Sequence, residues 1–134
     1  MKILVTGGGG VIGSNFIGCI LGTGKDFTVV KDDKLTYAGN MANLEQIAKD
    51  PDCTFVKGDI GDAPLLEAAM CGCDAVVHFA VESHVDRSIY EPWPVIQTNI
   101  TGTFVLLDVA RKLSISRFLH ISTDEVYGDI PPIT

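Results

Sequence analysis

"KILVTGGGGVIGSNF", residues 2–16, decides the fold of this chain. A short apolar run leads directly into four glycines, and a segment of helical period follows them. The glycine spacing fits G-x-x-G-x-x-G, with Gly7, Gly10 and Gly13, and it also fits G-x-G-x-x-G, with Gly8 in first place. Glycine permits the tight turn, lets the backbone approach a pyrophosphate and lets the helix pack on the strand. Because the start of such a helix offers free N–H groups and a positive dipole end, the stretch predicts a strand–loop–helix unit that binds a nucleotide.

The rest of the chain repeats this alternation of short apolar runs and longer segments of helical period. We expect strands at residues 2–6, 27–30, 54–57, 75–80 and 117–122. We expect helices at residues 12–21, 41–48, 64–70 and about 93–113, with Gly22 and Gly24 ending the first of them. Alternating strands and helices form parallel sheets, and right-handed crossovers favour a doubly wound arrangement. The predicted fold class is therefore α/β, a Rossmann-like parallel sheet of order 3-2-1-4-5 with helices on both faces.

Composition narrows the function classes. A chain of 134 residues is the size of one domain, and a net charge of −7 argues against binding nucleic acid. No apolar stretch approaches the roughly 20 residues that cross a bilayer, and the N-terminus shows no signal-peptide cleavage site. The four cysteines lack metal-ligand spacing, because Cys71-Gly-Cys73 is C-x-C. We therefore expect a cytoplasmic protein without a metal site and without a nucleic-acid or membrane partner.

An acidic residue near the end of the second expected strand refines the nucleotide prediction. Asp33 lies 20 residues after Gly13, where a carboxylate can accept hydrogen bonds from the ribose hydroxyls of NAD and would repel the 2′-phosphate of NADP. Asp32 is an alternative acceptor, and Lys34 weakens the exclusion of NADP. The pattern favours NAD, and the rival interpretation is a mononucleotide-binding or vestigial loop.

Two carboxylates mark the end of the fifth expected strand. In "STDEVYG", residues 122–128, Asp124 and Glu125 follow the hydroxyl residue Thr123. Ligands of open α/β sheets bind at the carboxyl ends of strands, so the pair is either an acid/base couple or a polar loop, and the residues alone favour the loop. Among the histidines, we expect His78 and His120 to be packed core residues, whereas a binding and a structural role are both open for His84.

Four stretches together resemble a known family. They are "TGGGGVIGSNF" (6–16), "DKLTYAGN" (33–40), "HFAVESHVDRS" (78–88) and "STDEVYG" (122–128). The first is shared widely among dinucleotide-binding proteins, whereas the middle two and "TDE" are much narrower. The chain resembles the extended short-chain dehydrogenase/reductase family, and within it the group of dTDP-glucose 4,6-dehydratases. The resemblance spans the whole chain but only the cofactor-binding half of such an enzyme.

The resemblance implies a role for individual residues, with NAD as the cofactor and a nucleotide sugar as the substrate. Residues on the pyrophosphate would be Gly7, Gly10 and Gly13, with Val11 and Ile12 beside it. The adenosine ribose would be lined by Asp33, Lys34, Thr36, Ala38 and Gly39, and the adenine by Asp59 and Ile60. The middle and nicotinamide half of the cofactor would lie near Ala80 and Thr98, and the sugar nucleotide would face Ser83 and His84. Thr123 would partner the catalytic tyrosine.

The implied reaction is NAD-dependent conversion of dTDP-glucose to dTDP-4-keto-6-deoxyglucose in deoxysugar biosynthesis of the rhamnose type. NAD takes a hydride from C4 of the sugar and returns it to C6 after water has left across C5 and C6. Asp124 would be the acid of this elimination and Glu125 its base, which requires different pKa values in two neighbouring carboxyl groups. The resemblance also implies a homodimer, with the helix at 93–113 in its interface.

Two departures from the family pattern bear on these expectations. Position 81 is Val where the family usually has Ala, which adds bulk near the nicotinamide or sugar. The family's Tyr-x-x-x-Lys pair is missing, because Pro131 stands four residues after Tyr127. We therefore expect residues 1–134 to be an NAD-binding domain that is inactive by itself, with the tyrosine, the lysine and the substrate-binding region after residue 134. The alternatives are another NAD-dependent sugar-nucleotide enzyme, an epimerase or a decarboxylase, and a cofactor-binding module without catalysis.

Overall fold

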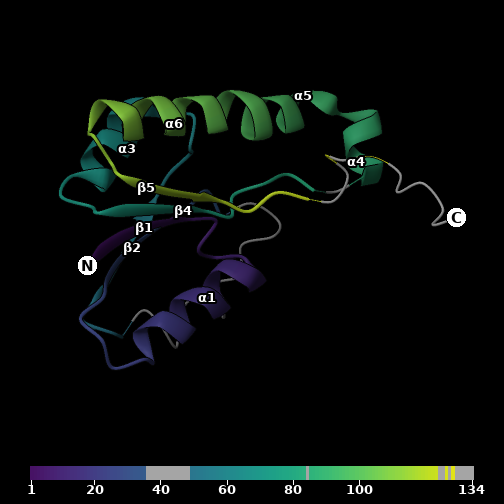
Figure 1. Ribbon diagram of the computed structural model, residues 1–134. Coiled ribbons are helices and arrows are strands. Elements are labelled where there is room, and N and C mark those ends of the chain that lie inside the picture. The colour runs from purple at the N-terminus through teal and green to yellow at the C-terminus, as the bar shows by residue number, and fades with distance from the viewer. Residues whose placement is uncertain (36–48, 84, 124–125, 127, 129–134) are drawn as a thin grey trace, which may run out of the picture.

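The computed structural model describes residues 1–35, 49–83, 85–123, 126 and 128, and shows a sheet covered by helices on both faces (Figure 1). The sheet has five parallel strands in the order β3-β2-β1-β4-β5. Their bounds are Lys2–Thr6 (β1), Thr28–Asp33 (β2), Cys53–Lys57 (β3), Ala75–His78 (β4) and Arg117–His120 (β5). This order confirms the predicted doubly wound sheet.

The register brings the carboxyl ends of the central strands to one edge. Thr6 at the end of β1 pairs with Asp32 on one side and His78 on the other, so whatever follows these strands gathers at the same edge. Three strands differ from the expected bounds at this edge: β2 continues to Asp33, β4 ends at His78 and β5 ends at His120.

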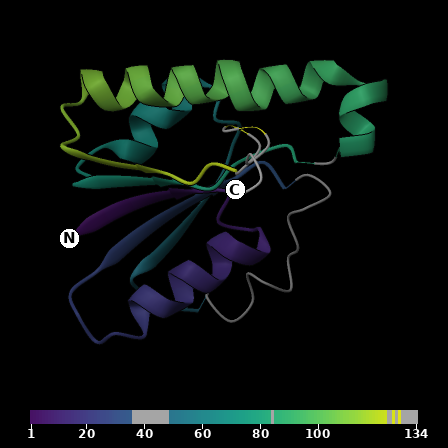
Figure 2. The ribbon, with the colours of Figure 1, turned by 45° about the vertical axis from the view of Figure 1, so that its right-hand side comes forward.

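Helices form a layer on each face of the sheet. They are α1 (Val11–Leu21), α3 (Ala63–Met70), α4 (Val85–Tyr90), α5 (Pro92–Val95), η1 (Ile96–Gly102) and α6 (Thr103–Lys112). Helix α1 lies on one face, and α3 with the long α5–η1–α6 rod lies on the other (Figures 1 and 2). Gly22 caps the C-terminus of α1, as predicted. The helix expected at 41–48 lies outside the described residues.

Alternation along the strands divides the core in two. Ile3, Val5, Val29 and Val77 pack with Ile17 of α1. The intervening residues of the strands pack against α3 and α6, in a cluster made of Leu4, Val30, Leu66, Ala69, Met70, Cys73, Val76, Leu106, Val109 and Ala110. Burial of each large aliphatic side chain stabilises the fold by about 1.5–3 kcal/mol.

The expected helix at 93–113 is a composite rod. Its middle, η1, has π geometry over seven residues. There Gly102 lies so close to Ile60 that a Cβ would come within 2.6 Å of the Ile60 Cγ1 atom. Helix α4 precedes the rod and was not predicted. The rod therefore approaches the turn after β3, which is one wall of the site described below.

The two expected core histidines differ. His78 is buried, with its Nδ1 atom 2.7 Å from the Thr6 hydroxyl and its Nε2 atom 3.1 Å from the Thr103 hydroxyl. Burial first, and then the neighbouring His120, lowers the pKa of His78 to about 4. The prediction for His120 is wrong, because this side chain is exposed. It lies on β5, the edge strand of the described sheet, where a neighbouring strand is present on one side only.

Candidate functional site

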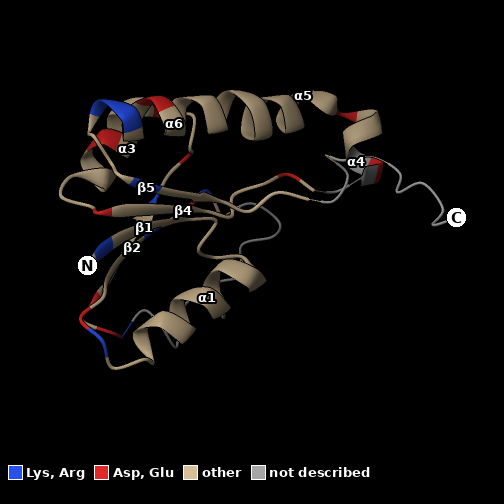
Figure 3. Cartoon of the chain, viewed as in Figure 1, with Lys and Arg blue, Asp and Glu red and all other residues tan. Residues whose placement is uncertain are grey.

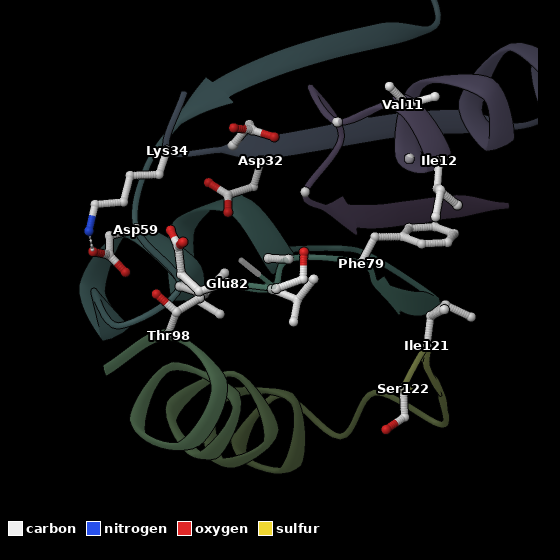
Figure 4. A pocket seen from close by; sticks show the side chains of 18 of the residues that line it. Val11, Ile12, Asp32, Lys34, Asp59, Phe79, Glu82, Thr98, Ile121 and Ser122 are labelled. Carbon is white, nitrogen blue, oxygen red and sulfur yellow. Dashed lines mark ion pairs between the residues drawn. The ribbon is translucent and has the colours of Figure 1, made fainter. Parts of the chain in front are cut away.

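A cavity of about 390 Å³ lies at the carboxyl ends of the strands. The glycine loop with the start of α1, the end of β2, the segments after β3, β4 and β5, and η1 all contribute to its wall. Figure 4 shows Lys34 and Asp59 joined at one end of the cavity, with Ile121 and Ser122 at the other. The position agrees with the general location of ligand sites in doubly wound sheets.

The glycine loop is shaped for close approach. Gly7 has a φ of 68°, and a Cβ on it would come within 2.7 Å of the Ala80 nitrogen. A Cβ on Gly13 would overlap the Gly7 carbonyl oxygen. The Gly10 amide donates to that same oxygen at 3.1 Å, and α1 begins at the next residue with no acidic side chain in its first turn. The loop and the helix N-terminus therefore fit a pyrophosphate.

Asp33 connects the end of β2 to the glycine loop. Its side chain is buried, with Oδ2 accepting the Gly9 amide at 2.7 Å and Oδ1 accepting the Leu35 amide at 2.7 Å. Because each carboxylate oxygen can accept more than one hydrogen bond, Asp33 can hold the loop and still accept ribose hydroxyls. Of the two candidate acceptors, Asp33 is the one that the structure places beside the glycines.

Asp32 occupies the opposite face of β2. Asp32 is only 1% exposed, and neither of its carboxyl oxygens has a hydrogen-bond partner among the described residues. Space for it depends on Gly58, where a Cβ would come within 2.8 Å of the Asp32 Oδ1 atom. Burial first, and then the charges of Asp33 and Asp59, raise the pKa of Asp32 to about 7. Sequence reasoning offered Asp32 as an acceptor but gave no sign that it is a buried, unpaired acid.

Lys34 and Asp59 form an ion pair at the same end of the cavity. The Lys34 Nζ atom lies 2.6 Å from the Asp59 Oδ2 atom, and Asp59 Oδ1 accepts the Gly61 amide at 2.9 Å. Burial acts to raise the pKa of Asp59, but the hydrogen bonds from Lys34 and Gly61 and the charge of Lys34 outweigh it and hold the pKa below its usual range. Asp59 is therefore a carboxylate at neutral pH.

The segment after β4 is fixed by a side chain that sequence reasoning missed. The Asn99 Oδ1 atom accepts the Glu82 amide at 2.9 Å, and Asn99 Nδ2 donates to the Glu82 carbonyl at 2.9 Å. The Asn99 side-chain amide thus makes the two hydrogen bonds that a neighbouring strand would make with Glu82. It holds Glu82 and Ser83 at the cavity wall. An asparagine inside a helical segment, where it is disfavoured, was the available signal.

The structure brings together most of the predicted site residues. Those that line the cavity are Gly7, Gly10, Val11, Ile12, Gly13, Asp33, Lys34, Asp59, Ile60, Ala80, Ser83, Thr98 and Thr123. Val81 lines it too, and so does Glu82, which was not predicted as a site residue. The remaining predicted residues lie outside the described residues: Thr36, Ala38, Gly39, His84, Asp124 and Glu125.

Two negative findings apply to the part of the chain that the structure describes. No group of three or more His, Cys, Asp or Glu side chains there is placed to hold a metal ion. Nor does any helix in those ranges have the length and apolar character needed to cross a bilayer.

Comparison with known proteins gives a consistent set of similarities. The sequence pattern of the family described as GDP-mannose 4,6 dehydratase matches residues 4–134. A dTDP-glucose 4,6-dehydratase of an Actinoplanes species is 50% identical in an alignment 135 residues long, which covers 97% of this chain and 42% of that protein. This chain thus spans about two fifths of the length of that relative.

Solved structures show the same likeness. The dTDP-glucose 4,6-dehydratase of Streptomyces venezuelae with NAD and TYD bound has a TM-score of 0.94 and 48% identity, covering 100% of this chain and 43% of that one. A UDP-glucose-4-epimerase of Stenotrophomonas maltophila with bound NAD has a TM-score of 0.86 and 32% identity, covering 99% and 40%. These findings confirm the resemblance predicted from the four sequence stretches.

Proposed function

We propose, since the chain belongs to the GDP-mannose 4,6 dehydratase family, that it is the NAD-binding portion of a dTDP-glucose 4,6-dehydratase. Such an enzyme is a lyase that converts dTDP-glucose to dTDP-4-keto-6-deoxyglucose. Between the two solved structures above, the identity is higher to the dehydratase than to the epimerase, 48% against 32%, which supports this choice of reaction. The observation that carries the proposal is the cavity, which the glycine loop, Asp33 and the segment ending in Thr123 all line.

Different residues of this chain would contact different parts of the cofactor. Backbone groups of the glycine loop would hold the pyrophosphate, and Asp33 would accept the hydroxyls of the adenosine ribose. Asp59 and Ile60 would flank the adenine, at the end of the cavity where Lys34 also lies. Ala80 and Thr98 would lie along the nicotinamide half. When bound, NAD supplies an acceptor and later a donor of hydride.

The opposite end of the cavity would receive the sugar. Ser83 lines the cavity next to Glu82, whose backbone pairs with the Asn99 side chain, and the Ser83 hydroxyl can hydrogen-bond a sugar hydroxyl. Thr123 lies at the same cavity and would orient the reacting hydroxyl. Asp124 as the acid and Glu125 as the base of water elimination stay predictions, and so does the binding role of His84.

The remaining expectations about the parent protein are also proposals. A Tyr-x-x-x-Lys pair and the substrate-binding region would follow residue 134, since the relatives are more than twice as long. A homodimer is supported by an apolar stripe along the rod, made of the exposed side chains of Trp93, Ile96, Ile100, Phe104 and Leu107. Their spacing of three or four residues places them on one helical face. The cytoplasmic location stays a prediction.

A non-catalytic NAD-binding module is the second candidate, favoured by the absence of Tyr-x-x-x-Lys within the 134 residues. The reading frame after residue 134 distinguishes the two candidates. A longer protein that carries the pair should convert dTDP-glucose, and not UDP-glucose, to an alkali-sensitive 4-keto product. Conversion of UDP-glucose to UDP-galactose would instead identify an epimerase.

Cofactor binding can be tested on the 134-residue chain itself. Calorimetric titration with NAD should show binding that Gly13→Ala abolishes, because the added methyl group overlaps the Gly7 carbonyl oxygen. Gly18→Ala is the matched control: it adds the same methyl group to the same helix, and apart from the adjacent backbone of that helix no atom lies within 4 Å of it. Equal NAD affinity of the two variants would contradict the assignment of the glycine loop.

A further inference from the structure

The charged side chains that line the cavity are mostly acidic. Among the described residues that line the cavity, Lys34 is the one basic side chain, whereas Asp32, Asp33, Asp59 and Glu82 are acidic. Lys34 directly follows the residue that would accept the ribose hydroxyls, so its ammonium is near any group attached to that ribose. A free lysine at this position would attract a 2′-phosphate and would favour NADP.

Lys34 is not free, because its ammonium lies 2.6 Å from the Asp59 carboxylate. Asp59 comes from the turn after β3, 25 positions along the chain, and its other oxygen is anchored by the Gly61 amide. The carboxylate is thus fixed in place, and the lysine reaches to it. Both side chains remain about half exposed, 57% for Lys34 and 44% for Asp59, so the pair borders the space that a ligand enters.

We propose that Asp59 is a specificity-determining residue, which holds the Lys34 ammonium in an ion pair and so withholds the cation of this pocket from a 2′-phosphate. Asp59 adds its own negative charge to the same region. Discrimination against NADP then has two parts, the carboxylates that repel the phosphate and the lysine that is prevented from binding it. This inference rests on the proposed function, since it requires that the cavity bind a dinucleotide.

A double-mutant cycle on the 134-residue chain tests the proposal. The proteins are the unmodified chain, Asp59→Asn, Lys34→Met and the double variant, each titrated with NAD and with NADP by calorimetry. The measured quantity is the ratio of the NADP dissociation constant to the NAD dissociation constant. Because both dinucleotides carry the same adenine, a change in adenine binding cancels in this ratio. Asparagine keeps an oxygen for the Gly61 amide, and Asp59→Ser serves as a second variant should Asp59→Asn fold poorly.

Asp59→Asn should lower the ratio about tenfold, which corresponds to about 1.4 kcal/mol. Lys34→Met alone should not lower the ratio, because the lysine is already engaged by Asp59. Adding Lys34→Met to Asp59→Asn should reverse most of the tenfold decrease. A ratio within twofold of the unmodified chain in Asp59→Asn, or a decrease that persists in full in the double variant, would overturn the proposal.

Asp108→Asn is the matched control. Asp108 pairs with Lys112 at 3.0 Å and with Arg111 at 2.8 Å in the last turns of α6, where Figure 3 shows basic and acidic residues side by side at the end of the helix. The substitution changes the net charge equally and breaks an Asp–Lys pair, so the ratio should stay unchanged. An equal decrease in this control would attribute the effect to net charge and overturn the proposal. Absence of NAD binding by the unmodified chain would refute the proposed function and, with it, this inference.

Discussion

Asp32→Asn should remove a large part of the pH dependence of this chain's stability between pH 5 and pH 8. Asp32 is buried without a hydrogen-bond partner in the described residues, and its pKa of about 7 lies far above the ordinary value of 3.8. Between those two values the folded chain holds a proton on Asp32 that the unfolded chain has released. Since stability falls with rising pH wherever the folded state binds more protons, Asp32 should destabilise the fold progressively from about pH 4 to about pH 7.

The magnitude follows from the two pKa values. One pKa unit corresponds to about 1.4 kcal/mol, so the full penalty above pH 7 is roughly 4 kcal/mol for the values 3.8 and about 7. Part of this penalty is already present at pH 5. The free energy of unfolding of Asp32→Asn, relative to the unmodified chain, should therefore rise by roughly 2 to 3 kcal/mol from pH 5 to pH 8.

Urea denaturation followed by circular dichroism at several pH values measures this difference directly. Asparagine has nearly the same shape as aspartate but does not ionise. Any cost of burying its unpaired amide therefore changes the free energy of unfolding by the same amount at every pH. Asp26→Asn, which removes an exposed carboxylate from the loop before β2, should give a nearly constant difference across the same range. A constant difference for Asp32→Asn as well would refute the reasoning, because it would mean that Asp32 ionises normally in the folded chain.

Three further outcomes are expected. Asp33→Ala should weaken NAD binding and bring the affinities for NAD and NADP closer together, because a ribose acceptor and the bonds to Gly9 and Leu35 are lost. Calorimetry measures both affinities, and a preference for NAD that the substitution leaves unchanged would contradict this. Asp62→Ala should lower the free energy of unfolding by about 1 kcal/mol, since Asp62 caps α3 through the Leu65 amide at 3.1 Å; urea denaturation measures it. In the longer parent protein, Asp124→Asn should slow the overall reaction about 10²–10⁴-fold while NADH accumulates, and stopped-flow absorbance would detect this; an unchanged rate of elimination would identify the carboxylates as a polar loop.

The spacing of residues along the chain was sufficient to predict much of the fold and part of the site. The fold class and the strand order followed from the glycine loop and from the alternation of apolar runs with helical segments, because backbone geometry imposes periods of two and 3.6 on strands and helices. Gly13 needed no long-range information either, since its close approach is to Gly7 in the same loop. Asp33 was found for the same reason, by its fixed distance along the chain from that loop.

The tertiary structure decided what depends on register and on packing between distant segments. Sequence alone could not show that Lys34 reaches Asp59, or that Asn99 pairs with the backbone of Glu82. Lys34 follows β2 and Asp59 follows β3, whereas Glu82 follows β4 and Asn99 lies in η1. It predicted a buried His120, but the exposure of this side chain depends on its place at the sheet edge. Strand alternation put Asp32 and Asp33 on opposite faces, but only the assembled sheet decided which face meets the glycine loop and which is closed over by Gly58. The hydrogen-bond partners and the solvent exposure of a carboxylate depend on residues that are close in space. Those residues come together only when the strands have paired in register.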